Sequence, residues 1–227
     1  MALITSKKAP KSEEELLDNA FGMTGKSLQQ IAIYLGMKVP DDQNKAKGWV
    51  GELIENFLGA TASSLPEPDF QHLGIELKTI PIDKHGKPRE STYVCTVPLS
   101  GNIGCTWEES IVKLKLSRVL WVPIEAKTTL PLSQRRIGRP FIWSPDKQQE
   151  ADLRNDWQEH MDMINMGELH KVSARQGKYL QIRPKAANAR ALSQTTIDTG
   201  ETGLTLPRGF YLRPTFTYLL VKAYAST

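Results

Sequence analysis

The hydrophobic pattern of this chain changes from a helical to an alternating period near Gly59, and this change restricts the possible folds most. Before it, apolar residues recur at three- and four-residue spacing, which predicts an amphipathic helix over about 47–58: Val50, Leu53, Ile54, Phe57 and Leu58. After it, Ile75, Leu77 and Thr79 alternate with charged residues, as in a strand with one buried face. A helix followed by a half-buried strand is typical of a mixed α/β domain.

The rest of the chain continues this mixture. Ser12 and Glu15 have the spacing of a capping box and predict a helix that runs to about Phe21. Apolar patterns predict further helices over 28–35 and 153–164, strands over 91–97, 119–124 and 178–183, and a final apolar segment over 216–224. No repeat or low-complexity linker interrupts these elements, so we expect a single domain over residues 1–227.

Composition excludes several classes of protein. Hydrophobic residues make up 40% of the chain and charged residues 24%, which is typical of a globular protein and not of a disordered or fibrous one. No apolar run approaches the roughly 18 residues of a membrane helix, and the first residues lack the pattern of a signal peptide. Cys95 and Cys105 are too few for a disulfide scaffold and lack the Cys-x-x-Cys spacing of structural zinc. We therefore expect a cytoplasmic protein without a membrane partner.

Positive charge is concentrated in the second half of the chain. The net charge is only +4, but residues 101–227 carry 18 basic and 12 acidic side chains. Basic residues without any acidic one occupy the stretch from Lys171 to Ile197: Lys171, Arg175, Lys178, Arg183, Lys185 and Arg190. Such a stretch fits a solvated face, and it also fits a surface that binds a polyanion. Charge alone does not decide between them.

Two acidic residues and one lysine form the pattern that points most directly to chemistry. In a strand, Glu76 and Lys78 lie on one face and Leu77 on the other, and Asp69 in the preceding turn can fold back beside Glu76. Two carboxylates and a backbone carbonyl suit Mg²⁺, and a nearby lysine can orient and deprotonate a water molecule. The same residues also fit an ordinary amphipathic edge strand. Glu55 lies off the centre of the helical apolar stripe, so periodicity alone predicts that it faces solvent.

Longer blocks of sequence carry a resemblance to a known family. They lie between about Glu14 and Phe216 and comprise Trp49–Gly51, Leu58–Ala60, Pro66–Phe70, Leu73–Pro81, Arg118–Trp121, Leu180–Asn188 and Leu206–Leu212. These blocks resemble the MutH family, the strand-nicking endonucleases of methyl-directed mismatch repair. The chain is also similar to restriction enzymes that cut the sequence GATC, and the Asp-Glu-x-Lys pattern alone does not separate the two. The C-terminal blocks favour the MutH family, whereas the first fifteen residues and the tail after Tyr218 carry no inference.

The resemblance implies a restriction-endonuclease-like fold, in which helices flank a mixed central sheet and two lobes form a cleft for duplex DNA. The catalytic lobe would span about 10–105 and the DNA-reading lobe about 106–227. The resemblance also implies nicking of the unmethylated strand at hemimethylated GATC sites, Mg²⁺ as the cofactor, and MutL as an activating partner. We expect a monomer, since one active site reaches one phosphodiester. The alternatives are a GATC-cutting restriction endonuclease and a non-catalytic DNA-binding protein of the same fold.

Carried over position by position, the resemblance assigns roles to individual residues. Asp69 and Glu76 would ligate Mg²⁺, and Lys78 would assist the attacking water. Glu55 would complete the acidic site from its helix; this expectation is opposite to the one from periodicity, and we follow the family. Two further lysines would contact the DNA backbone: Lys47 and Lys115.

Residues in and beyond the acid-free stretch are candidates for reading the DNA. Arg183, Pro184 and Lys185 follow each other at the end of a predicted strand and can enter a groove as a stiff loop, because proline fixes its own φ angle. Arginine and lysine pair well with guanine O6 and N7, and contact with phosphate alone is the alternative for each. Tyr211 is the candidate sensor of adenine N6 methylation, with Arg208 nearby to hold a phosphate. The alternative for Tyr211 is an ordinary core position.

Overall fold

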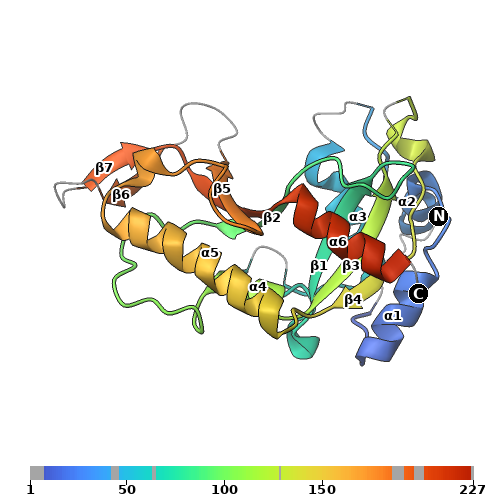
Figure 1. Cartoon of the computed structure of the whole chain (residues 1–227). Coiled ribbons are helices and arrows are strands. Elements are labelled where there is room, and N and C mark those ends of the chain that lie inside the picture. Colours follow the sequence, from blue (N-terminus) through green and yellow to red (C-terminus); the bar gives the residue numbers. More distant parts are fainter. Residues whose placement is uncertain are drawn as a thin grey trace. The chain divides into compact units, whose positions relative to one another are not determined.

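The computed structural model describes residues 8–41, 46–62, 65–127, 129–185, 192–196 and 202–225 (Figure 1). The chain divides into two compact units, and each draws on separate stretches of sequence. The first unit comprises Met1–Glu90, Ser117–Ser144 and Tyr218–Thr227, and the second comprises Ser91–Leu116 and Pro145–Thr217. The lobe boundary expected near residue 105 falls within the second unit. Both units contain helices and strands, which confirms the predicted mixed α/β class.

The first unit contains a sheet with the strand order β1-β3-β4. Strand β1 (Glu76–Ile82) runs parallel to β3 (Val119–Glu125), and β4 (Phe141–Trp143) pairs with β3 in the antiparallel direction. The described residues of this unit also form α-helices and short 3₁₀ helices: α1 (Glu13–Phe21), α2 (Leu28–Leu35), α3 (Ala46–Leu58), η1 (Gln71–Leu73) and η2 (Leu132–Gln134).

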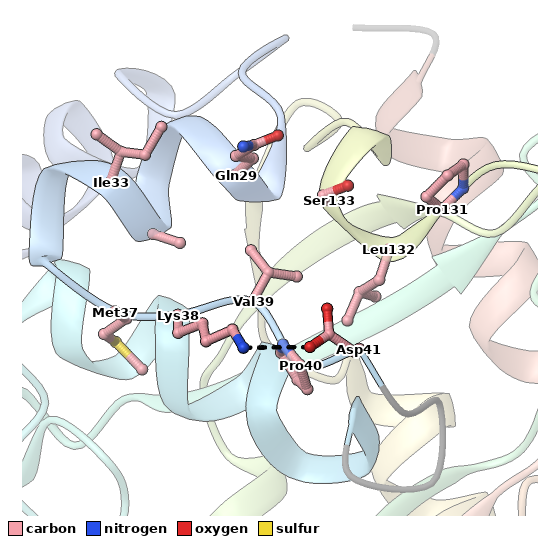
Figure 2. Close-up of a pocket in the computed structure, with 11 residues that line it drawn as sticks. Gln29, Ile33, Met37, Lys38, Val39, Pro40, Asp41, Pro131, Leu132 and Ser133 are labelled. Carbon is pink, nitrogen blue, oxygen red and sulfur yellow. Dashed lines mark hydrogen bonds and ion pairs between the residues drawn. The ribbon is translucent and has the colours of Figure 1, made fainter.

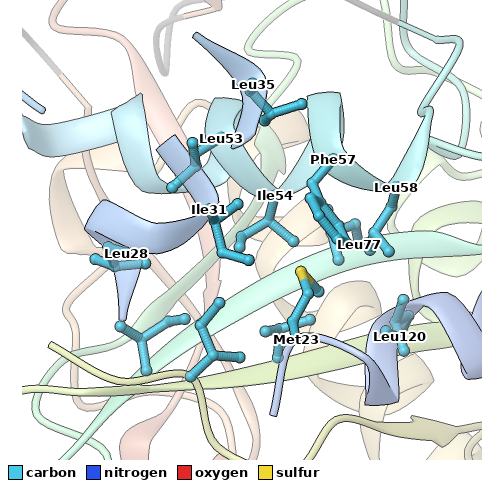
Figure 3. Packing of buried hydrophobic residues seen from close by; sticks show 14 of the residues in the cluster. Met23, Leu28, Ile31, Leu35, Leu53, Ile54, Phe57, Leu58, Leu77 and Leu120 are labelled. Carbon is cyan, nitrogen blue, oxygen red and sulfur yellow. The ribbon is translucent and has the colours of Figure 1, made fainter. Parts of the chain in front are cut away.

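One face of this sheet is buried beneath α1, α2 and α3 (Figure 3). The hydrophobic cluster joins Leu53 of α3 to Leu77 of β1 and Leu120 of β3, and the last two are register partners whose side chains share a face. Burial of each such side chain contributes roughly 1.5–3 kcal/mol. A slip of one residue would turn Glu76 into this core, so the apolar face fixes the register of β1. Glu76 and Lys78 consequently belong to the opposite face.

The first two helices begin at residues whose side chains cap the helix N-terminus. Ser12 Oγ accepts the backbone N–H of Glu15 at 3.2 Å, but the Glu15 carboxylate accepts the N–H of Lys11 instead of that of Ser12. The predicted capping box is therefore formed from one side only. Helix α2 has a complete capping box at its start and ends at Gly36, whose φ of 66° lies in the left-handed region that glycine adopts without strain.

The second unit contains an antiparallel sheet with the strand order β2-β8-β5. Strand β8 (Arg208–Leu212) lies between β2 (Thr92–Thr96) and β5 (Leu180–Pro184). The described residues of this unit also form a small hairpin and several helices: β6 (Ser193–Thr196), β7 (Thr202–Thr205), α4 (Ile111–Leu116), α5 (Lys147–Asn165) and η3 (Leu169–Lys171). Helix α6 (Pro214–Ala225) begins in the second unit and ends in the first.

A buried carboxylate fastens β5 to α5. Asp156 accepts hydrogen bonds from the backbone N–H groups of Lys178, Tyr179 and Leu180, at 2.7, 2.6 and 2.8 Å. One turn further along the helix, Nε2 of His160 lies 3.3 Å from the carbonyl oxygen of Leu180. Burial lowers the pKa of this histidine, which favours the neutral ring at pH 7. These contacts fix the beginning of β5 on α5. They thereby help to position the exposed residues at the other end of the strand.

The elements predicted from long one-sided patterns are confirmed. Helices over 28–35 and 47–58 and the strand over 119–124 match α2, α3 and β3 to within a residue. Helix α5 begins earlier than its apolar pattern, at Lys147, because Asp146 caps it. Strands β4 and β8 are not predicted from the sequence, since the first has only 3 residues and the second contains a glycine. No helix of the described ranges is long and apolar enough to cross a membrane.

Candidate functional site

The turn that joins Asp69 to β1 is closed by backbone pairing. Phe70 and Ile75 exchange two hydrogen bonds, with N···O distances of 2.9 and 3.3 Å. Helix η1 lies between them, and Gly74 ends it with a φ of 64°. The Asp69 carboxylate accepts the backbone N–H of Leu77 at 2.8 Å. Asp69 is therefore held beside the first residues of β1. This is the position that its spacing from Glu76 in the sequence predicts.

Glu76 and Lys78 form a buried ion pair on β1. Nζ of Lys78 donates to Oε1 of Glu76, and the two side chains are 12% (Lys78) and 3% (Glu76) exposed. Their register partners on β3 are the fully buried residues Val119 and Trp121. The acid and the base share one face, as the alternation predicts, but Glu76 is covered by its neighbours and does not project into open solvent.

Glu55 of α3 belongs electrostatically to the same group. Its carboxylate is half-buried; burial raises its pKa, and the negative charge of Asp69 is the next cause. Glu76 adds to this rise, and Lys78 opposes it. The solvent-facing position predicted from periodicity is therefore wrong, because α3 contacts β1. Periodicity gives the angle from the centre of the apolar stripe, and it does not report what packs at the edge of that stripe.

The acidic group offers hard oxygen donors of the type that Mg²⁺ prefers. Among the described residues, no group of three or more His, Cys, Asp and Glu side chains is placed to hold a metal ion. Mg²⁺ does not need such a cage, because it binds through one or two carboxylates and completes its shell with water and substrate phosphate. Asp69 and Glu76 fit this requirement, and the contact with Lys78 shows that the Glu76 carboxylate already attracts a cation.

A second candidate group lies on the polar face of the β2-β8-β5 sheet. Tyr93 of β2 is the register partner of Tyr211 of β8, and their rings meet edge to face with centroids 5.4 Å apart. The guanidinium carbon of Arg183 lies 6.0 Å from the centroid of the Tyr211 ring, within cation–π range. Arg183 also donates to the Ser91 hydroxyl at 3.1 Å. The fold thus brings together Arg183 and Tyr211, which the sequence analysis selects separately.

Lys185 adds a second cation to this face. Its Nζ lies 3.9 Å from the centroid of the Tyr93 ring, donates to the Tyr93 hydroxyl, and lies 3.4 Å from Oγ1 of Thr96. Its backbone N–H donates to the carbonyl of Pro207 at 2.7 Å. The side chains of residues 183–185 are exposed. The described part of the predicted loop is therefore anchored through its backbone and presents its cations to solvent.

Gly209 lies against both tyrosine rings. A Cβ atom at this position would lie 2.8 Å from Cε2 of Tyr211 and 3.0 Å from Cε2 of Tyr93, so a side chain would displace at least one ring. The preceding residue, Arg208, is half-buried, and its Nε has no hydrogen-bond partner within the described part of the chain. The Nε–H group of Arg208 is therefore a buried donor that the described residues do not satisfy.

Three residues of this face are not predicted from the sequence: Ser91, Tyr93 and Gly209. The sequence predicts a strand over 91–97, but the side chains that meet Tyr211 depend on how β2 pairs with β8. That pairing has a register shift between Tyr93 and Cys95, which alternation alone does not locate. The one available signal is a tyrosine within a predicted strand.

The other predicted DNA contacts are only partly described. Lys115 is half-buried in the last turn of α4. Lys47 lies in α3, but its side chain is outside the described residues, as is all of Arg190. Two lysines of the acid-free stretch form ion pairs of 2.6 and 2.7 Å, which fit the solvated-face alternative: Lys171 with Glu168 and Lys178 with Asp152.

A cavity of about 630 Å³ lies between α2 and η2 (Figure 2). Its wall combines apolar and polar side chains, and the ion pair drawn in it joins Lys38 to Asp41 at 3.2 Å. Among the described residues that line this cavity there is no candidate catalytic or DNA-reading residue, so we assign it no part in the chemistry.

Comparison with known proteins agrees with the sequence resemblance. The family model described as "DNA mismatch repair enzyme MutH" matches residues 58–156, a range that includes Asp69, Glu76 and Lys78. The chain is 53% identical over 212 residues to the DNA mismatch repair protein MutH of Klebsiella pneumoniae (strain 342), which covers 93% of this chain and 92% of that protein. It is 51% identical over 212 residues to the protein of the same name from Escherichia coli (strain K12), which covers 93% of each chain.

Proposed function

Because the chain belongs to the MutH family of DNA mismatch repair endonucleases, we propose that it nicks the unmethylated strand at hemimethylated GATC sites, with Mg²⁺ as its cofactor. Family membership makes the chain an endodeoxyribonuclease with a restriction-endonuclease-like fold and DNA as its substrate. The observation that carries the finer proposal is the placement of Asp69, Glu76 and Lys78 together at the beginning of one strand.

Asp69 and Glu76 are the proposed ligands of Mg²⁺. When bound, the ion supplies a Lewis acid for the scissile phosphate and lowers the pKa of a bound water molecule. Lys78 orients the attacking water and offsets the negative charge that builds on the phosphate, since its ammonium group already lies against Glu76. Glu55 completes the acidic group from α3. Its raised pKa makes it a better proton acceptor than an ordinary glutamate.

The polar face of β2-β8-β5 is the proposed reader of the GATC sequence. Arg183 and Lys185 are exposed cations of the types that pair with guanine O6 and N7 in the major groove, and Pro184 stiffens the backbone between them. Tyr211 is the proposed sensor of adenine N6, with its ring held by Tyr93 and Arg183. Arg208, at the beginning of β8, is the proposed contact of a nearby phosphate.

Further parts of the proposal rest on the family alone. Lys47 and Lys115 contact the DNA backbone, and MutL activates the enzyme. The protein acts as a monomer in the cytoplasm, since its substrate is chromosomal DNA and one active site suffices for one strand. A catalytic lobe over about 10–105 and a DNA-reading lobe over about 106–227 would form the DNA cleft, which stays a prediction.

A plasmid with one hemimethylated GATC site tests the proposed function. We expect nicked circles only when Mg²⁺ is present, with the nick in the unmethylated strand, and faster nicking when MutL is added. Double-strand cleavage of an unmethylated site as the main reaction of the protein alone would instead indicate the GATC-cutting restriction endonuclease. Binding to the duplex without any nick would indicate the non-catalytic DNA-binding alternative.

A further inference from the structure

Pro10 and Glu13 are linked to the segment that carries the proposed metal ligands, the first directly and the second through Arg118. His72, in the middle of η1, places Nε2 at 2.6 Å from the carbonyl oxygen of Pro10. Arg118, just before β3, donates to both carboxylate oxygens of Glu13. The backbone carbonyl of the same Arg118 accepts the N–H of Glu76 at 3.0 Å. The turn after Asp69 and the beginning of β1 are thus connected to the same few N-terminal residues.

The N-terminal residues that make these contacts are themselves held in place. Pro10 is buried, and Ser12 caps α1 through the N–H of Glu15. Leu16 and Ala20 of α1 have no exposed surface and belong to the hydrophobic core. Because α1 is packed in this way, residues 10–13 form a fixed support for η1 and Arg118.

The contact between Arg118 and Glu13 is a two-bonded fork. Nε donates to Oε2 at 2.5 Å and Nη2 donates to Oε1, while Nη1 donates to Ser144 Oγ at 3.1 Å. The Arg118 and Glu13 side chains are 40% and 37% exposed. Ion pairs at such exposure contribute little to global stability, whereas a fork fixes the relative orientation of its two partners. The fork therefore acts mainly on geometry.

We propose that Pro10–Glu13 is a clamp that sets the spacing of Asp69 and Glu76 for metal binding, with His72 and Arg118 as positioning residues. The proposal rests on the metal-binding roles proposed above for the two carboxylates. Asp69 precedes η1 and Glu76 begins β1, so a displacement of η1 or of the Arg118 carbonyl changes their spacing directly. Mg²⁺ demands near-octahedral geometry with ligands at about 2.0–2.1 Å. A small change in spacing therefore weakens ion binding before it weakens the fold.

The clamp is tested by measuring how nicking depends on Mg²⁺ concentration in variants that lose one or the other of its two contacts. In His72→Ala and in Glu13→Gln, we expect the Mg²⁺ concentration for half-maximal nicking to rise about tenfold, as when other positioning partners of metal ligands are lost. The nicking rate at saturating Mg²⁺ should stay close to that of the wild type. Mn²⁺ binding to the protein without DNA, measured by calorimetry, should weaken by the same factor.

Matched variants distinguish the loss of the clamp contacts from the mere loss of a carboxylate charge or of an imidazole ring. Glu14→Gln removes an exposed carboxylate from the same helical turn, and His85→Ala removes an exposed imidazole from the same unit; neither should change ion binding. His72→Gln should recover part of the ion affinity, because its amide N–H can still donate to the Pro10 carbonyl.

The outcomes decide between the clamp and a purely structural role. Weaker ion binding at an unchanged melting temperature supports the clamp. Unchanged ion binding in both His72→Ala and Glu13→Gln overturns it, and so does a lower melting temperature without weaker ion binding. If the wild type shows no Mg²⁺-dependent nicking, the proposed function fails, and the Mn²⁺ measurement still decides the clamp.

Discussion

The carboxylate of Asp69 accepts the backbone N–H of Leu77, the residue that separates Glu76 from Lys78 on β1. Leu77 points its side chain into the core beneath α1–α3, so the same residue fixes the strand with its side chain and Asp69 with its backbone. The packing of the core therefore contributes to the position of the Asp69 carboxylate. A change at Asp69 should consequently affect chemistry far more than it affects the fold.

Replacement of the proposed ligand is the first test of this arrangement. Asp69→Ala should reduce nicking to background, because one of two carboxylates for Mg²⁺ is lost. Affinity for a GATC duplex without Mg²⁺ should stay near that of the wild type, measured by fluorescence anisotropy. Glu14→Ala, which removes an exposed acid of the same unit, is the control and should nick normally. A near wild-type nicking rate in Asp69→Ala would exclude Asp69 as a ligand.

Lys78 should show an effect on stability as well as on catalysis. Lys78→Ala removes the cation from a pair in which Glu76 is almost completely buried, and loss of one partner of a buried pair costs up to about 3–5 kcal/mol. We expect a lower melting temperature, partly restored by Mg²⁺, which replaces the missing positive charge. Nicking should stay absent even at saturating Mg²⁺. Recovery of nicking at saturating Mg²⁺ would mean that Lys78 acts only through its charge and does not orient the attacking water.

The raised pKa of Glu55 predicts a pH-dependent stability. The folded state holds this proton more tightly than the unfolded state, so the contribution of Glu55 to stability is greatest below the ordinary carboxyl pKa of 4.5 and is lost as pH rises through the folded-state value. Glu55→Gln removes this penalty. Without Mg²⁺, it should melt at a higher temperature than the wild type at pH 7, where each kcal/mol corresponds to roughly 2–4 °C. The two melting temperatures should converge near pH 4.

Thermal melting of both proteins across this pH range, with and without Mg²⁺, provides the control for Glu55. The ion should stabilise the wild type more than Glu55→Gln, because the variant has one charge fewer near the proposed metal site. A difference in melting temperature that is constant from pH 4 to pH 7 would mean that the charge of Glu55 does not cause it.

Local spacing in the sequence predicts the geometry of the proposed catalytic group around Asp69, Glu76 and Lys78 better than that of the proposed DNA-reading group around Arg183 and Tyr211. Asp69, Glu76 and Lys78 lie within one turn and one strand, so alternation places them with little outside information. Glu55 comes from another helix, and only the family resemblance selects it. Tyr93 and Gly209 meet through the pairing of two strands far apart in the sequence, and no local pattern contains that register.

The same distinction applies to the fold. Helices α2 and α3 and strand β3 are predicted because each has a long apolar pattern and buries it. The N-terminal contacts of His72 and Arg118 are not predicted, since each joins residues with a large sequence separation and neither leaves a periodic signal. Single hydrogen bonds between distant segments depend on how the core packs, so they cannot be predicted from the local sequence.

Arg183 should contribute to sequence specificity and not only to affinity. Arg183→Ala should cost about 1–3 kcal/mol on a GATC duplex, with a smaller loss on random DNA, if its guanidinium reads guanine. Lys171→Ala is the comparison: any loss should be the same on both duplexes and should flatten the salt dependence of binding. Binding isotherms at several salt concentrations measure both effects. Equal losses of Arg183→Ala on the two duplexes would place Arg183 among the phosphate contacts.

Strand discrimination is the last property that the polar face of β2-β8-β5 should control. A methyl group on adenine N6 adds bulk and removes a hydrogen bond, and a buried polar group left without its partner costs about 1–3 kcal/mol. Tyr211→Phe lacks the hydroxyl proposed to sense N6. We expect its ratio of nicking rates on unmethylated and methylated strands to fall about tenfold or more, while the rate on unmethylated DNA stays dependent on Mg²⁺ in the same way.

Gly209→Ala tests whether the position of the Tyr211 ring matters in addition to its hydroxyl. The new Cβ would lie 2.8 Å from the ring of Tyr211 and 3.0 Å from that of Tyr93, so the rings must shift while both hydroxyls remain. We therefore expect weaker strand discrimination in Gly209→Ala, measured by nicking of hemimethylated and fully methylated duplexes side by side. Gly138→Ala, at another tightly packed glycine in the first unit, controls for a general effect of crowding. If Tyr211→Phe and Gly209→Ala both keep the wild-type ratio, methylation is sensed elsewhere on the protein.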